Sequence, residues 1–175
     1  MNAPGIAQRL HELGITLPAV AAPVAAYVPA VRTGSYVWTS GQLPFVDGVL
    51  AGTGKVGDAD GLVAPARAAE LARIAVLNAL AAVAEQAGSL DRVRRIVKVV
   101  GYVASDPSFT GQPLVVNGAS ELLGQLFGEA GVHARSAVGV AVLPMDAPVE
   151  TELVVELSCR ARRPDGRASA GPALQ

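Results

Sequence analysis

The chain is poor in residues that bind transition metals or form cross-links. Its 175 residues include one cysteine, Cys159, and two histidines, His11 and His133. A single cysteine excludes a disulfide within the chain, and the two histidines lie far apart without an H-E-x-x-H motif. Three such residues are a poor basis for a zinc site, so we expect no metal ion.

Charged residues are also scarce, at 17% of the chain, and neither sign dominates. Lys and Arg number 14 against 15 Asp and Glu, giving a formal net charge of −1, whereas a nucleic-acid-binding domain usually carries a basic face. One basic cluster lies in a C-terminal tail rich in Pro, Gly, Ala and Ser: Arg160, Arg162, Arg163 and Arg167. A solvated, disordered tail explains it better than a nucleic-acid arm, so we expect no nucleic-acid partner.

Long apolar runs are absent as well. No stretch approaches the roughly 18 residues that span a bilayer, and the first residues lack the basic and apolar regions of a signal peptide. We therefore expect a cytoplasmic protein without a membrane partner.

The chain is rich in small apolar side chains. Apolar residues make up 51% of it, mostly Ala, Val and Leu, whereas aromatic residues make up 4%. A chain of this length forms one domain of ordinary size. The apolar excess predicts a buried subunit interface in addition to a core.

Apolar periodicity and turn residues predict the order of the elements. We expect a short helix over 3–13, a connector over 18–29, a strand over 35–40, a hairpin over 43–51 turning at Asp47-Gly48, helices over 65–87 and 113–127, and strands over 95–104, 136–143 and 149–159. The second long helix is expected to bury Leu114, Leu122, Leu123 and Leu126. This order predicts an α+β fold in which one mixed sheet carries both long helices on a single face. The other face then lacks cover, and subunit association is expected to supply it.

Two familiar catalytic motifs are incomplete. The segment Gly52-Thr-Gly-Lys55 fails as a phosphate-binding loop, because Val49 and Val56 stand where a glycine and a Ser or Thr are required. The nearest match to a G-x-S-x-G nucleophile motif is Gly118-Ala-Ser120, and Leu122 takes the place of its last glycine. The sequence motifs therefore give little support for nucleophilic catalysis.

Polar residues interrupt the apolar pattern at three places. They are Thr39-Ser-Gly-Gln-Leu-Pro44 at the end of a strand, Asn117 in the second long helix, and His133-Ala-Arg-Ser136 with Leu143-Pro144 and Glu150 behind it. An arginine near the start of a strand offers a bidentate fork for a ligand carboxylate. Taken singly, each residue also has a structural interpretation: an ion pair for Arg135, a solvated strand position for Glu150, and a helix-surface position for Asn117.

Together these motifs resemble those of the RidA/YjgF family of enamine and imine deaminases, over roughly Tyr27 to Glu156. The resemblance implies a chorismate-mutase-like α+β fold and a homotrimer with three clefts between neighbouring subunits. It places the family domain over 27–160, after an N-terminal helix and connector over 1–26 and before a disordered tail over 161–175. The long N-terminal segment is typical of a less characterised branch.

The resemblance also implies roles for individual residues. Arg135 is expected to bind the carboxylate of 2-aminoacrylate or a related 2-imino acid, and Glu150 to position or activate water. The expected pocket-lining residues are Tyr27, Ser40, Asn117, His133 and Ser136. Proximity and one oriented water supply the catalysis that such a reaction needs, with neither a metal nor an organic cofactor. Ala137 stands where many deaminating members carry a cysteine, and His133 where proline is frequent.

Two other functions are compatible with the same residues. A non-catalytic metabolite-binding or chaperone-like trimer needs the arginine but not the glutamate. The family also carries the label of endoribonuclease or translation inhibitor, which the near-neutral charge disfavours. Retention of both Arg135 and Glu150 favours the deaminase.

Overall fold

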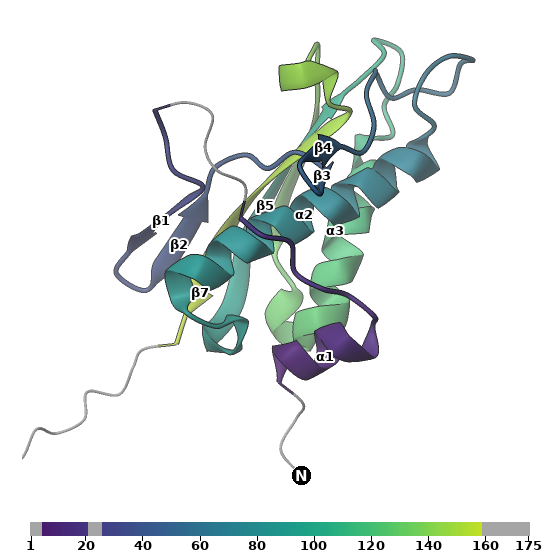
Figure 1. Cartoon of the computed structure of the whole chain (residues 1–175). Coiled ribbons are helices and arrows are strands. Elements are labelled where there is room, and N and C mark those ends of the chain that lie inside the picture. The colour runs from purple at the N-terminus through teal and green to yellow at the C-terminus, as the bar shows by residue number, and fades with distance from the viewer. Residues whose placement is uncertain (1–4, 21–25, 159–175) are drawn as a thin grey trace, which may run out of the picture.

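A five-stranded mixed sheet forms the centre of the computed structural model, which describes residues 5–20 and 26–158 (Figure 1). The predicted basic tail and Cys159 lie outside the described residues. The strand order is β1-β2-β7-β5-β6, where only β5 and β6 run parallel. The strands are β1 (Ala30–Thr33), β2 (Tyr36–Thr39), β5 (Val93–Ala104), β6 (Ala134–Val140) and β7 (Val149–Leu157). A separate hairpin pairs β3 (Phe45–Val46) with β4 (Val49–Leu50).

Both long helices, α2 (Pro65–Ala87) and α3 (Gln112–Phe127), lie on one face of the sheet, and the short α1 (Ile6–Glu12) lies near α3 (Figure 1). The described residues also form short 3₁₀ helices, which are η1 (Leu90–Arg92), η2 (Gly128–Gly131) and η3 (Pro144–Asp146). The two long helices approach closely at Gly118, where a Cβ would overlap the carbonyl oxygen of Ala69. Glycine at this position therefore allows the two-helix layer to form.

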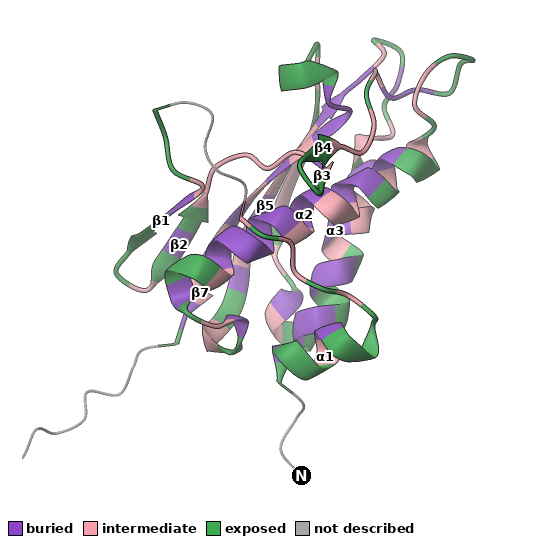
Figure 2. Ribbon diagram, in the orientation of Figure 1, coloured by how far each residue is buried: buried purple, intermediate pink, exposed green. Residues whose placement is uncertain are grey.

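The alternation of burial along β7 shows which sheet face the helices cover. Its odd-numbered residues are buried, whereas Glu150, Glu152 and Glu156 are half-buried on the other face. Figure 2 colours the ribbon by this burial. Within the described ranges no helix covers this second face. We call it the helix-free face; its exposed apolar residues include Val31, Trp38 and Val138.

Most of the predicted elements are confirmed. The first long helix begins at Pro65 and ends before Gly88, whose φ of 80° suits a glycine stop. The hairpin turns at Asp47-Gly48, both with positive φ. The mixed sheet with both helices on one face, and the uncovered opposite face, are as expected from the element order.

Besides smaller shifts in element bounds, three details differ from the predictions. Strand β1 lies directly after the connector and was not predicted, because Ala30–Thr33 is too short to show alternation. Strand β6 ends at Val140 rather than 143, because its partner β5 ends at Ala104. Leu114 is 67% exposed rather than buried, since Val115 and Val116 occupy the inward positions of that turn.

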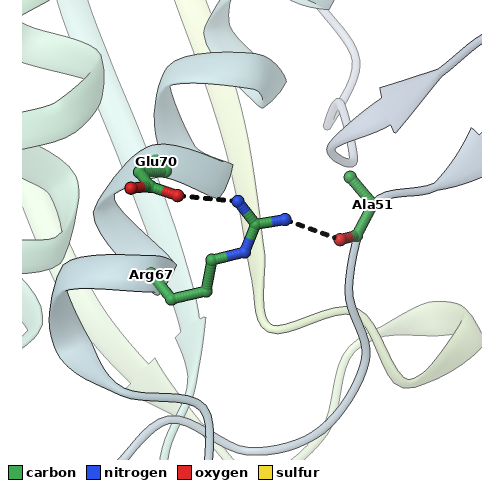
Figure 3. A network of polar contacts seen from close by, with 3 residues as sticks. All are labelled: Ala51, Arg67 and Glu70. Carbon is green, nitrogen blue, oxygen red and sulfur yellow. Dashed lines mark hydrogen bonds and ion pairs between the residues drawn. The ribbon is translucent and has the colours of Figure 1, made fainter.

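Helix α2 also holds the segments that lead into the hairpin and out of it. The buried amide of Asn78 donates to the carbonyl oxygens of Leu43 and Phe45, both at 3.0 Å. At the surface, Arg67 joins Glu70 at 2.7 Å and the carbonyl of Ala51 at 3.0 Å (Figure 3). The Asn78 contacts fix the path of the Ser-Gly-Gln-Leu-Pro motif. The Arg67 contact is exposed and contributes at most about 1 kcal/mol.

No helix among the described residues has the length and apolar character needed to cross a membrane.

Candidate functional site

Helix α3 orients the guanidinium of Arg135. Nη1 donates to Oδ1 of Asn117 at 2.8 Å and to Oγ of Ser120 at 3.1 Å. Asn117 and Ser120 are three residues apart on one face of the helix, so both can reach the same side chain. Ion pairs among residues 5–20 and 26–158 join Arg67 to Glu70 and Arg94 to Glu156, and none includes Arg135. The structural ion pair considered for Arg135 is thus not formed within the described chain.

Ser120 connects Arg135 to His133. Its Oγ lies 3.0 Å from Nε2 of His133, and Nδ1 of that ring lies 2.6 Å from the carbonyl oxygen of Gly131. Because a carbonyl only accepts, the neutral imidazole carries its proton on Nδ1 and accepts at Nε2. The hydrogen bonds therefore run in one direction, from Arg135 through Ser120 and His133 to the backbone.

The environment of His133 favours its neutral form. Burial lowers the pKa of the imidazole below its usual value of 6.5, and the positive charge of Arg135 lowers this pKa further. The hydrogen bond to Gly131 opposes both effects without cancelling them. At neutral pH the Nε2 lone pair is therefore available as an acceptor.

Arg135, Ser120 and His133 line an open pocket of about 290 Å³, together with Gly124, Gly131 and Val132. The two glycines have no side chain to fill the pocket, so it stays open beside Ser120, His133 and Arg135. We call this the Arg135 pocket. It suits a small ligand with a negative group that can accept from the guanidinium.

A larger pocket of about 390 Å³ lies at the carboxyl ends of β5 and β6, but the polar side chains of Ser105, Asp106 and Gln112 in its wall are already bonded within the chain. Asp106 accepts from the backbone N–H and hydroxyl of Ser108, at 2.9 and 2.6 Å. Gln112 donates to Ser105 at 3.2 Å and to the carbonyl of Phe109 at 2.7 Å. The Arg135 pocket is thus the better candidate for ligand binding.

Glu150 lies on the helix-free face of β7, against the backbone of Gly41. A Cβ at position 41 would overlap Oε1 of Glu150, so the glycine of the Ser-Gly-Gln motif leaves room for this carboxylate. Burial raises the pKa of Glu150, and the nearby charge of Glu152 raises it further. Burial likewise raises the pKa of Glu152, and the hydrogen bond with Tyr102 offsets only part of this increase. This cluster holds protons more readily than exposed carboxylates do.

Ser40 precedes Gly41 and is bonded to the segment that follows Tyr27. The hydroxyl of Ser40 donates to the carbonyl of Val28 at 2.6 Å, and its backbone N–H donates to Pro29 at 2.9 Å. These bonds fix the segment next to Tyr27, whose side chain is 48% exposed before β1. Ser40, next to Gly41 in sequence, therefore belongs to a second group with Glu150, and Tyr27 lies on the segment that Ser40 binds.

Ser136 does not share a face with Arg135, although the two are adjacent in sequence. Arg135 pairs in register with the buried Val99, and Ser136 pairs with the half-buried Val100. The hydroxyl of Ser136 accepts from Nζ of Lys98 at 2.9 Å, on the helix-free face. Strand alternation thus separates Ser136 from the Arg135 pocket of its own chain.

The predicted site residues therefore fall into two groups within one chain. Asn117, His133 and Arg135 lie on the helix-covered side at β6, whereas Glu150 lies on the helix-free face of β7. Strand β5 separates β6 from β7, which places the two backbones about 10 Å apart across the sheet. A site that uses both Arg135 and Glu150 requires groups from more than one copy of the chain.

Two residues of the site were not identified from sequence, Ser120 and Gly41. Ser120 lies one helical turn after Asn117, and this spacing was the available signal. For Gly41 the signal was a glycine after a strand, but the carboxylate that fills its missing side chain comes from a residue 109 positions later. No cluster of three or more His, Cys, Asp or Glu side chains suited to a metal occurs in the described ranges.

Comparison with known proteins gives consistent relatives. Residues 7–157 match the family model described as "YjgF/chorismate_mutase-like, putative endoribonuclease". The chain is 47% identical to protein TCP17 of Trypanosoma cruzi over 87% of its own length and 94% of that protein. The crystal structure of protein Atu1372 from Agrobacterium tumefaciens is similar with a TM-score of 0.79 and 44% identity, over 87% of this chain and 92% of that one. E. coli TdcF with bound serine is similar with a TM-score of 0.56 and 26% identity, over 82% and 96% of the two chains.

Proposed function

The chain belongs to the YjgF/chorismate mutase-like family, and from this premise we propose that it hydrolyses small 2-imino acids or their enamines to 2-oxo acids and ammonia. The observation that carries the proposal is the state of Arg135. Its guanidinium is oriented by Asn117 and Ser120, has no carboxylate partner among the described residues, and borders an open pocket. A ligand carboxylate is the partner that this geometry favours.

Hydrolysis of an imine requires water to attack the imine carbon and the nitrogen to leave as ammonia. Arg135 would hold the carboxylate and fix the position of the adjacent imine carbon. Glu150 is the group proposed to position the water, and its raised pKa makes it a stronger base than an exposed carboxylate. Neither step uses a metal or an organic cofactor.

We propose that a homotrimer brings the two groups together. In one chain Arg135 and Glu150 lie on opposite faces of the sheet, so a neighbouring copy would supply one of them. Exposed apolar side chains on the helix-free face, including Val31, Trp38 and Val138, support contact between copies.

A non-catalytic ligand-binding trimer is the second candidate. It is favoured by the separation of Glu150 from Arg135 in one chain, because binding of a carboxylate needs only the Arg135 pocket. The serine bound to E. coli TdcF is a small carboxylate-bearing molecule and is compatible with either candidate.

A coupled assay separates the two candidates. An amino-acid oxidase generates a 2-imino acid, and semicarbazide traps the imine that remains. The proposal predicts faster ammonia release and less trapped imine when this protein is added. Unchanged rates, combined with measurable binding of a 2-oxo acid, would instead support the binding protein.

A further inference from the structure

The pair of Ser120 and His133 has the geometry of a nucleophile with its general base. Ser120 Oγ lies 3.0 Å from Nε2 of His133, and the Gly131 carbonyl fixes the ring by accepting from Nδ1 at 2.6 Å. A nucleophilic hydroxyl needs such a base within hydrogen-bond reach and a third group that orients the base. In this chain a backbone carbonyl takes the orienting place.

The surroundings of Ser120 also suit a developing negative charge. Nη1 of Arg135 donates to Oγ at 3.1 Å, and a cation at this distance stabilises an alkoxide and the oxyanion formed next to it. Within the described chain, the side-chain hydrogen bonds of Arg135 use Nη1 alone, which leaves Nη2 and Nε without protein acceptors on a residue that lines the pocket. The glycines at 124 and 131 leave space beside the hydroxyl.

We propose that Ser120 is a nucleophile activated by His133, and that the Arg135 pocket hydrolyses small activated esters that carry a carboxylate. The pocket size limits the substrate to a small molecule, and the unused guanidinium donors select a carboxylate-bearing one. The activity uses the same pocket as the proposed imine hydrolysis but does not rest on that reaction.

The reaction has two balanced steps. Oγ attacks the ester carbonyl carbon while its proton moves to Nε2 of His133, and the C–O bond to the alcohol then breaks as the alcohol takes that proton. This leaves an acyl group on Ser120. Water next gives a proton to Nε2 and attacks the acyl carbon, which releases the carboxylic acid and returns the proton to Oγ. No oxidant, metal or further reactant is needed.

The test uses the full-length protein and two chromogenic esters, p-nitrophenyl acetate and mono-p-nitrophenyl succinate. We expect a burst of p-nitrophenol, faster with the succinate, and an acyl adduct that peptide mapping of acid-quenched protein locates on Ser120. Ser120→Ala should remove the adduct, and His133→Gln should slow the burst by about 100-fold or more. His11→Gln is the matched control, because this histidine is exposed on α1, and it should leave the burst unchanged.

Several outcomes would overturn the proposal. Cysteine thiols in general are acylated by such esters, so the experiment is repeated with Cys159→Ala; a burst lost in that variant and kept in Ser120→Ala would show that the thiol reacts instead. Absence of any adduct on wild-type protein treated with the esters and with diisopropyl fluorophosphate would contradict it without relying on variants. Thermal melts check that each variant is folded. Acylation of Ser120 without imine hydrolysis would refute only the proposed function, and imine hydrolysis without acylation would refute only this inference.

Discussion

Arg135 and Glu150 point to opposite faces of one sheet, with strand β5 between the strands that carry them. Two residues so placed cannot act on one small molecule within a single chain. If both take part in the reaction, the site must form between copies, and assembly becomes a requirement for activity. This relationship leads to the first two predictions.

Trp38→Glu should break the assembly into monomers. Trp38 is 49% exposed on the helix-free face, where a buried interface would have to desolvate the new carboxylate. Light scattering after size exclusion should give the mass of three 17.7 kDa chains for the wild-type protein and the mass of one chain for the variant. Leu13→Glu is the control: Leu13 is 42% exposed just after α1, away from the sheet, and its variant should remain a trimer. A wild-type monomer would refute the interfacial site.

Two impaired variants should recover activity when mixed. Arg135→Ala and Glu150→Gln each remove one of the two groups, yet a cleft between copies can combine the intact arginine of one with the intact glutamate of the other. Random exchange of subunits should form such clefts in about a quarter of cases. Native mass spectrometry would verify the mixed trimers, and imine hydrolysis would then be compared with that of the separate variants. Mixed trimers without recovered activity would show that both groups are not used in one cleft between copies.

Gly41→Ala should lower the rate of imine hydrolysis by displacing Glu150. The added Cβ would overlap Oε1 of that side chain, while the backbone of Gly41 needs no left-handed conformation. Gly41→Ala and Glu150→Gln both act through the Glu150 side chain. The double variant that carries both changes should therefore be no slower than Glu150→Gln alone. Steady-state rates of the three variants test this, and independent, multiplicative losses would argue against the contact.

Acid should destabilise the wild-type protein more than His133→Gln. The folded-state pKa of His133 is lowered from 6.5, so between these two values the unfolded chain binds a proton that the folded chain does not. The free energy of unfolding therefore falls as the pH falls through this window. Urea unfolding at fixed protein concentration, above and below pH 6.5, should show a smaller loss for the variant. Equal losses would contradict the neutral, desolvated imidazole.

Elements and contacts differ in how far the sequence predicts them. The long helix over 65–87 combines apolar periodicity with a starting proline and a stopping glycine, so local rules determine it. Strand β1 is only four residues long and owes its conformation to pairing with β2, which no local pattern shows. Leu114 belongs to the same apolar pattern as its neighbours, but the packing of α3 on the sheet leaves it outside.

The candidate site was also only partly predictable from the sequence. Arg135 and Glu150 could be singled out because polar residues interrupt apolar strands. Their separation onto two faces depends on the register in which β6 and β7 pair with β5, which the sequence did not indicate. The contact between Ser120 and His133 depends on how α3 packs beside β6, and for that reason an incomplete motif gave no sign of it.

Imine hydrolysis by Arg135→Ala, measured beside the wild-type protein and Arg135→Lys, tests the central claim most directly. Loss of a charge-assisted carboxylate contact costs about 2–5 kcal/mol, or roughly 30- to several-thousand-fold in rate. Lysine should rescue poorly, because an ammonium lacks the two parallel donors of the fork. Arg73→Ala, which removes a half-buried arginine whose bond to Gln125 is exposed on the outer surface of the helices, is the matched control. We predict that Arg135→Ala stays folded and trimeric while its rate falls by this factor. A folded Arg135→Ala trimer that hydrolyses 2-imino acids at the wild-type rate would contradict the account.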